Sequence, residues 1–130
     1  MWKEVLLVGA GGFIGSISRY LLGGWAHALW PRAGFPIGTL LVNIAGCFCI
    51  GLLAGFIEHR QMFGPEARLF LLIGLLGGFT TFSTFAYETL GLMRGSALLA
   101  ALLNAVGHVA LGLLAAWGGH GLVTTAIGSR

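Results

Sequence analysis

Charged side chains are scarce in this sequence. Only 8% of its 130 residues are charged, whereas 57% are hydrophobic and the mean hydropathy is +0.92. A soluble domain carries about 25% charged residues, so the composition predicts an integral membrane protein. The net charge of +3 is spread too thinly to form a nucleic-acid-binding surface, and we expect no nucleic-acid partner.

Acidic residues are the rarest charged type, and all four are glutamates: Glu4, Glu58, Glu66 and Glu88. Each lies at or near the end of an apolar segment. The sequence therefore offers no carboxylate within a predicted span that could exchange protons for a substrate. It also has no constellation of residues typical of an active site, and we predict that the protein is not an enzyme.

Cysteine is limited to Cys47 and Cys49. These residues lie two positions apart in one predicted helix, on roughly opposite faces, so they cannot form a disulfide with each other. Neither residue forms a metal or redox motif with its neighbours. We interpret both as small, buried apolar residues.

Long apolar runs are abundant. Four stretches approach the roughly 20 residues that a spanning helix needs, and they are continuously apolar rather than alternating, which favours helices over a β-barrel. We predict one transmembrane domain over residues 1–130, with little left for a soluble domain. The predicted spans are Val5–Gly24, Gly38–Ile57, Leu69–Tyr87 and Ser96–Trp117. In the first span, Gly11-x-x-x-Gly15 offers a small-residue face for close helix packing.

Basic residues show almost no bias between the two sides of the predicted bundle. With four spans, one side holds four basic residues and the other holds three, so the positive-inside rule favours neither orientation. A chain with so little bias is expected to insert in both orientations and to pair antiparallel with itself. The first side has Lys3, Arg60, Arg68 and Arg130, and the second has Arg32 and Arg94 with Arg19 nearby.

The third span changes character halfway along, over residues 77–85. Gly77-Gly78 is expected to break the helix, and Phe79 to Phe85 then alternate hydroxyls with phenyl rings. Non-helical backbone at membrane depth persists only where it is buried in protein or faces water or an ion. Carbonyls freed by a break would suit a hard cation such as Na⁺, whereas hydroxyls and ring edges would suit a small anion. A face used only for packing is the alternative.

Other spans contain single polar residues. Arg19 either reaches the interface or provides a fixed positive charge that favours an anion. Asn43 either forms an interhelical hydrogen bond or donates to a permeating anion. Asn104 and His108 lie one turn apart on one face of the fourth span, as core residues or as a polar track. Gly118-Gly119 is expected to end this helix.

Residues 77–85, Gly-Gly-Phe-Thr-Thr-Phe-Ser-Thr-Phe, closely resemble the core motif of the Fluc (CrcB) fluoride channels. Gly38-Thr39-x-x-x-Asn43 resembles the second-helix motif of that family, and Gly15-Ser16-x-x-Arg19-Tyr20-Leu21 resembles the first-helix motif. The resemblance covers all four spans and the chain length.

The resemblance implies a fluoride-specific channel that exports cytoplasmic fluoride passively. It implies an all-α antiparallel, dual-topology homodimer in the cell (inner) membrane, with two fluoride pathways and a third helix broken mid-membrane. It also implies a structural, untransported Na⁺ held by backbone oxygens of Gly77 and Thr80 of both copies. The implied fluoride pathway contains Asn43, Phe82, Ser83, Thr84 and Phe85, with a fourth-helix track of Asn104 and His108 and a vestibule charge at Arg19. Asn104 and His108 are where the sequence departs most from the family pattern.

Two other functions are consistent with a short four-helix protein. A small dual-topology, proton-coupled exporter would need a carboxylate inside the membrane, which the positions of the glutamates do not provide. A non-transporting assembly subunit would use its polar face only for packing against a partner. Fluoride flux into or out of liposomes that contain only this protein would separate a channel from both.

Overall fold

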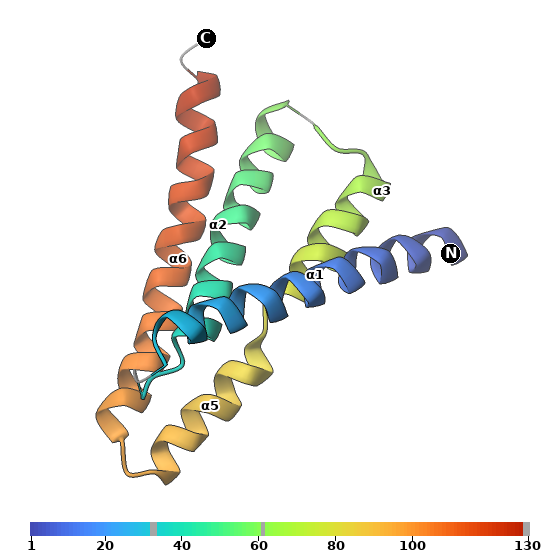
Figure 1. Cartoon of the computed structure of the whole chain (residues 1–130). Helices are drawn as coiled ribbons and strands as arrows, with labels where there is room; N and C mark the ends of the chain where they lie inside the picture. The colour runs from blue at the N-terminus through green and yellow to red at the C-terminus, as the bar shows by residue number, and fades with distance from the viewer. Residues whose placement is uncertain (32–33, 61, 129–130) are drawn as a thin grey trace.

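A computed structural model describes residues 1–31, 34–60 and 62–128. These residues form an all-helical structure, as predicted (Figure 1). Arg32 and Arg130, two residues of the predicted charge balance, lie outside the described residues. The elements are α1 (Trp2–Leu29), α2 (Ile37–Arg60), α3 (Pro65–Arg68), the π-helix η1 (Leu69–Leu76), α4 (Gly77–Phe79), α5 (Phe82–Arg94) and α6 (Leu98–Gly128).

The four predicted spans are confirmed, and each is longer than its apolar stretch. The segments long and apolar enough to cross a membrane are Trp2–Leu29, Ile37–His59, Pro65–Arg94 and Leu98–Ile127. In the first three spans these extra turns contain the charged residues other than Arg19.

The prediction that Gly118-Gly119 ends the fourth helix is wrong, since α6 continues to Gly128. Gly119 is buried where α6 packs on α2, and a Cβ there would collide with the backbone carbonyl of Phe48. This glycine is needed for a close approach between helices rather than for a stop. A Cβ on Gly51 of α2 would collide with the Ala116 carbonyl of α6, and one on Gly55 would lie 2.8 Å from the Val123 side chain. Helices α2 and α6 therefore form a tightly packed pair that runs side by side in Figure 1. The prediction that both cysteines of α2 are buried is wrong, since Cys47 is only partly buried and Cys49 is exposed.

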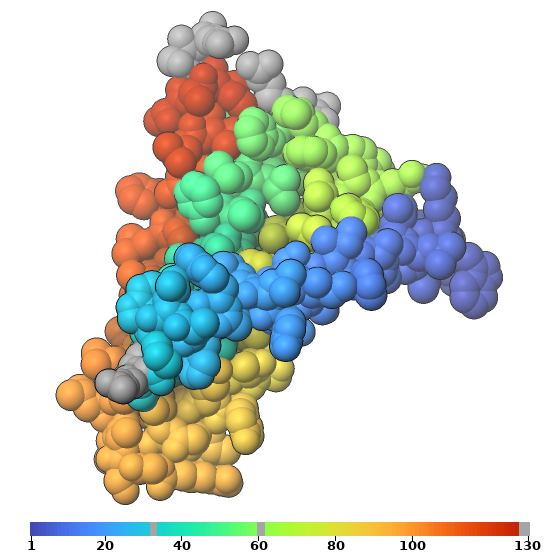
Figure 2. All heavy atoms as spheres, in the orientation of Figure 1, coloured from blue at the N-terminus to red at the C-terminus, as the bar shows by residue number. Residues whose placement is uncertain are grey.

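Helix α1 crosses α2 and the first half of the third span, as Figure 2 shows from one side. The predicted small-residue face of α1 makes this contact. A Cβ on Gly11 would lie 2.5 Å from the Phe70 carbonyl, and one on Gly15 would collide with the Leu75 carbonyl. Both glycines are buried, so the two backbones approach more closely than any side chain would allow.

The third span is built from several short elements. A single turn, α3, begins with Pro65 at its first position, and the backbone then continues as η1 and α4. Helix α5 follows after two extended residues and turns toward α6, against which it packs. The span is therefore a bent rod whose first half contacts α1 and whose second half contacts α6.

Candidate functional site

The third span is interrupted at Thr80 and Thr81, which are extended, with φ and ψ of −83° and 157° for Thr80 and −151° and 116° for Thr81. The prediction that the helix breaks at Gly77-Gly78 is wrong by three residues, because both glycines are helical in α4. Thr81 begins α5 as its N-cap, and its hydroxyl oxygen accepts a hydrogen bond from the Thr84 backbone N–H at 3.3 Å. A threonine in this role stabilises the start of a helix.

Asn43 of α2 explains where the interruption lies. Its Oδ1 accepts from the Thr81 N–H at 2.8 Å, and its Nδ2 donates to the Thr81 carbonyl at 3.1 Å. In an uninterrupted helix the Thr81 N–H would bond to the Gly77 carbonyl, so the side chain of Asn43 replaces a helical partner. The interhelical hydrogen bond considered for Asn43 is observed. One amide N–H and one oxygen lone pair remain for a further partner.

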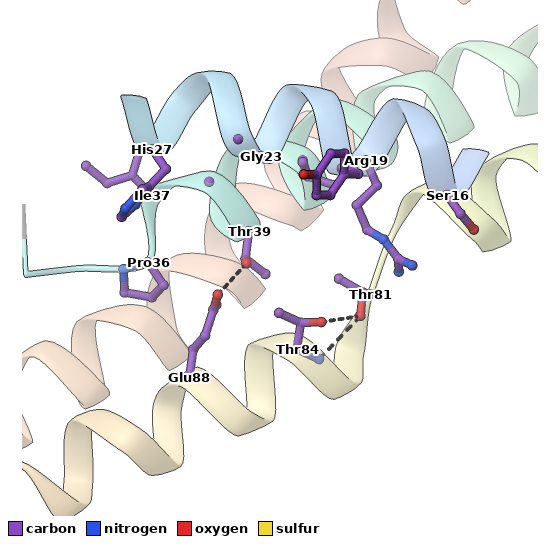
Figure 3. A pocket seen from close by; sticks show the side chains of 14 residues that line it. Ser16, Arg19, Gly23, His27, Pro36, Ile37, Thr39, Thr81, Thr84 and Glu88 are labelled. Atoms are coloured by element: carbon purple, nitrogen blue, oxygen red, sulfur yellow. Dashed lines mark hydrogen bonds between the residues drawn. The ribbon is translucent and has the colours of Figure 1, made fainter. Parts of the chain in front are cut away.

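The other extended residue, Thr80, remains attached to α4 on one side. Its N–H and its hydroxyl both donate to the Leu76 carbonyl at 2.9 Å. Among the described residues, its own carbonyl accepts a single hydrogen bond, a long one of 3.5 Å from Nη1 of Arg19. Arg19 therefore points from α1 toward the interruption (Figure 3).

A polar cavity of about 390 Å³ lies between α1, α2 and α5, beside this arginine (Figure 3). Thr39 donates to Oε1 of Glu88 at 2.7 Å inside it. Oε2 of Glu88 is buried and has no hydrogen-bond partner among the described residues. We call this cavity the vestibule; its polar lining includes Ser16, Arg19, Thr39, Thr81, Thr84 and Glu88.

Glu88 and Thr39 are site residues that sequence reasoning missed. Glu88 was expected near the end of a span, but α5 continues to Arg94, so the carboxylate lies inside the helix and is only partly exposed. The signal for Thr39 was its place in the Gly-Thr-x-x-x-Asn motif, four residues before Asn43. That spacing puts both side chains on one face of α2, toward α5.

A second cavity, also about 390 Å³, is mostly apolar and lies on the other side of Thr81. Phe82 and Phe85 contribute rings whose centroids are 5.3 Å apart, and the Phe85 ring lies 4.4 Å from the imidazole of His108. Phe82 is 80% exposed. We call this cavity the phenyl groove; it also includes Asn43, Gly77 and Thr80.

Asn104 and His108 of α6 contact α5 beside the phenyl groove. Nδ1 of His108 bonds to the Asn104 carbonyl at 2.9 Å, and because a carbonyl can only accept, Nδ1 carries the proton. Asn104 is fully buried and its Nδ2 donates to Thr89 at 2.8 Å. Nε2 of His108 and Oδ1 of Asn104 are both buried without a partner in the described parts of the chain.

Most of the predicted site residues come together at the interruption. Thr84 lies in the vestibule, while Asn43, Phe82, Phe85 and His108 line the groove. Ser83 is exposed and lies 3.3 Å from the Thr81 hydroxyl. Ser83 and Asn104 are the exceptions, because they line neither cavity; Asn104 is buried between α5 and α6.

The two cavities share Thr81 in their linings. Arginine and hydroxyl groups line the vestibule, whereas the Asn43 amide and two phenyl rings line the groove. These groups can replace the hydration shell of a small anion. The unpartnered atoms of Glu88, Asn104 and His108 are unusual, since buried polar atoms in proteins are normally hydrogen-bonded.

Known proteins resemble this chain over almost its whole length. The proteins named "Fluoride-specific ion channel FluC" include one from Thermus thermophilus, 49% identical over 97% of this chain and 98% of its own length. Another, from Rhizobium meliloti (strain 1021), is 46% identical over 93% of this chain and 96% of its own. "Fluoride-specific ion channel FluC 1" of Methanosarcina acetivorans is 44% identical over 87% of this chain and 85% of its own.

The sequence also matches, over residues 6–120, the family described as CrcB-like protein, Camphor Resistance (CrcB). The match begins in α1 and ends in α6, so it includes all four spans and every predicted site residue. The relatives are above 40% identity over most of their length, which agrees with the family match. This chain is a multi-pass membrane protein of the CrcB-like family.

Proposed function

We propose that the protein is a fluoride-specific ion channel that releases cytoplasmic fluoride passively. The observation that carries the proposal is a pair of cavities that share Thr81, one lined by Arg19 and hydroxyls and the other by Asn43 and two phenyl rings. The names of its relatives support the choice of anion. Hydrogen fluoride is a weak acid that crosses membranes as a neutral molecule and dissociates in a more alkaline cytoplasm. An inside-negative potential then favours anion exit by about 2.3 kcal/mol per 100 mV.

Each predicted residue has a physical role in this proposal. Arg19 makes the vestibule attractive to an anion, and Asn43 offers its remaining N–H at the interruption. The positive edges of the Phe82 and Phe85 rings meet the ion in the groove. Thr84 adds a hydroxyl in the vestibule, and Ser83 adds one beside Thr81. His108 lies against Phe85 and can turn a ring nitrogen toward the same space. Asn104 holds α5 through Thr89 and is a positioning residue.

A proton-coupled exporter is the weaker alternative. Glu88 does supply a partly buried carboxylate, which the sequence did not suggest, but the relatives are named as ion channels and none of those reported above as an exporter. The channel is therefore the better supported of the two functions.

Fluoride efflux from liposomes that contain only the purified protein tests the proposal. Potassium fluoride is loaded inside, valinomycin is added to balance charge, and a fluoride electrode records release, with potassium chloride in matched vesicles. We expect fast fluoride release and no measurable chloride release. Equal release of both anions, or release that requires a proton gradient, would overturn the proposed function.

We further propose that two copies pair antiparallel in the cell inner membrane, with Thr80 and Thr81 at mid-depth. The phenyl groove is open on the surface of a single chain, with Phe82 exposed, and a second copy would enclose it. A single cysteine in place of Lys3, labelled in intact cells with an impermeant thiol reagent after Cys47 and Cys49 are replaced by serine, reports orientation. About half of the molecules should react; complete labelling or complete protection would exclude insertion both ways.

The Gly77 and Thr80 carbonyls fit a structural Na⁺ between the two copies. The Thr81 N–H that a continuous helix would give to Gly77 is bonded to Asn43 instead, and within the described part of the chain the Thr80 carbonyl has only its long bond to Arg19. Such underused oxygens are the ligands that hard cations prefer. When bound, the ion would hold two interrupted helices together. Replacing Na⁺ by N-methyl-D-glucamine should lower fluoride flux, and ²²Na⁺ should not enter the same vesicles.

A further inference from the structure

A cluster of three metal-ligating side chains lies away from the ion pathway, at the ends of α2 and α6. Glu58 and His59 belong to the last turn of α2, and His120 belongs to the third-last turn of α6. These ends lie together because α2 and α6 run in the same direction and pack through glycines (Figure 1). A Cβ on Gly55 would lie 3.3 Å from the His120 carbonyl, so the position of His120 is fixed by backbone packing.

The three side chains converge on one point. Nε2 of His120 lies 2.8 Å from Oε2 of Glu58, and the rings of His59 and His120 have centroids 6.2 Å apart. One ligand atom from each residue lies within 4.8 Å of the other two. Glu58 and His59 are exposed, and the side chain of His120 is 35% exposed, so an ion can reach them from the water phase.

The electrostatics of α2 favour a cation at this place. The C-terminal end of a helix carries partial negative charge, and a carboxylate in the last turn is therefore unfavourable. Glu58 occupies this turn in spite of that cost. A positive ion bound by its carboxylate would offset both the charge of the side chain and that of the helix end.

We propose that Glu58, His59 and His120 bind a divalent transition metal, with Zn²⁺ as the ion of best fit. Two imidazoles and one carboxylate form a known three-ligand zinc set that leaves a fourth position to water. Bond lengths of about 2.0–2.1 Å place tetrahedral ligand atoms about 3.3–3.4 Å apart. The 2.8 Å pair must therefore open slightly and the wider pairs must close, which rotations of exposed side chains can supply.

The bound ion would fasten the end of α2 to α6 on one side of the membrane. It would add a cross-link to a helix pair that carries Asn43 on one member and His108 on the other. The site is independent of the fluoride proposal, because none of its three residues lines the vestibule or the phenyl groove. Failure of either proposal would leave the other standing.

Calorimetric titration of ZnCl₂ into the detergent-solubilised protein, with its affinity tag removed, tests the site. We expect one Zn²⁺ per chain and a higher melting temperature in its presence. Glu58→Gln, which keeps the hydrogen-bonding shape but removes the negative ligand, should weaken binding at least about tenfold, since even outer partners of a metal site cost 10–100-fold. Co²⁺ titration should give the intense visible absorption of a four-coordinate ion.

Two further variants keep the test decisive. His59→Gln changes an exposed side chain, so it should fold normally and still lose metal affinity. His27→Gln changes a histidine at the end of α1 and should bind Zn²⁺ like the original protein. No saturable binding below about 1 mM, which corresponds to only about −4 kcal/mol, would overturn the proposal. So would unchanged affinity in both Glu58→Gln and His59→Gln.

Discussion

The two halves of the third span are held in place by different kinds of contact. The first half, η1 and α4, is apolar and lies against α1 through backbone contacts at Gly11 and Gly15. The second half, α5, carries hydroxyls, a carboxylate and phenyl rings, and it lies against α6. One half is held by the shape of the backbone and the other by hydrogen bonds.

Only the polar half leaves buried atoms without partners in the described chain. Oε2 of Glu88 belongs to α5, and the unpartnered atoms of Asn104 and His108 face it from α6. The apolar half has no comparable group among the described residues, and its close contacts hold the interruption in place. The fold therefore separates a tightly packed support, where the first half of the third span meets α1, from a surface whose polar atoms remain available to bind an ion. An ion pathway needs both.

The largest loss of stability should come from adding a side-chain atom where α1 packs against the first half of the third span. Gly15→Ala places a Cβ against the Leu75 carbonyl and 2.8 Å from the Phe79 N. Backbone atoms cannot move aside like a flexible side chain, so we expect destabilisation at the upper end of overpacking costs, about 3 kcal/mol or more. Melting temperature and the monodisperse fraction in size-exclusion chromatography measure it.

Gly9→Ala is the matched control on the same helix, because nothing lies within 4 Å of its Cβ. Its stability should stay the same or rise slightly, since alanine favours helix over glycine by about 1 kcal/mol. Equal losses in the two variants would mean that the support does not depend on backbone contact.

The contact between Asn43 and Thr81, where the two halves of the third span meet, should be the next most sensitive to substitution. Asn43→Leu removes both hydrogen bonds to the Thr81 backbone. Leaving a buried donor and a buried acceptor unpaired costs about 1–3 kcal/mol each, so we expect a loss of about 2–6 kcal/mol and slow fluoride efflux. Cys49→Leu, an exposed change on the same helix, should alter neither. A stable Asn43→Leu variant would show that Thr81 finds other partners.

Replacing phenylalanine by isoleucine should mainly lower fluoride efflux in the second half of the third span and mainly lower stability in the first half. Phe85→Ile removes a ring edge from the polar half, and because such ring interactions are worth up to about 1.5 kcal/mol, fluoride efflux should fall by about tenfold. Phe82→Ile should act in the same direction. Phe70→Ile in the apolar half should cost less than about 1.5 kcal/mol of stability and leave efflux per folded protein unchanged. Similar flux losses from Phe85→Ile and Phe70→Ile would remove the distinction.

The smallest effect should come from the exposed ion pair that links α1 to the start of the third span. Nζ of Lys3 lies 2.6 Å from Oε1 of Glu66, and both side chains are mostly exposed. Exposed pairs contribute less than about 1 kcal/mol, so Lys3→Gln should barely change the melting temperature or the efflux. A double-mutant cycle with Glu66→Gln measures the pair itself; a large coupling would mean that charge, and not shape, holds the support.

The sequence predicted what depends on composition and local pattern. Continuous apolar runs were enough for four spans, and Gly11 and Gly15 were enough for a close helix contact. The hydroxyl and phenyl pattern located the region of the site. These features could be predicted because each is determined by residues that are close in the sequence.

The features that were missed depend on contacts between distant residues. The interruption lies at Thr80–Thr81 because the side chain of Asn43, almost 40 positions earlier, accepts the hydrogen bond of the Thr81 N–H. Helix α6 passes through Gly119 because α2 needs that space. Glu88 joins the site because Thr39 reaches it from another helix. Whether η1 forms a π-helix or an α-helix depends on which backbone carbonyl accepts a hydrogen bond from each N–H, and a run of leucines does not determine this pattern.

The glycine contact between α1 and the third span also has a genetic consequence. Every glycine codon becomes an alanine codon through one base change, so Gly11, Gly15, Gly74 and Gly78 are each a single mutation from a steric collision. No smaller residue exists that could compensate on the opposite helix. We therefore expect substitutions to be tolerated at open glycines such as Gly9 and Gly118, whereas selection should retain glycine at the four contact positions.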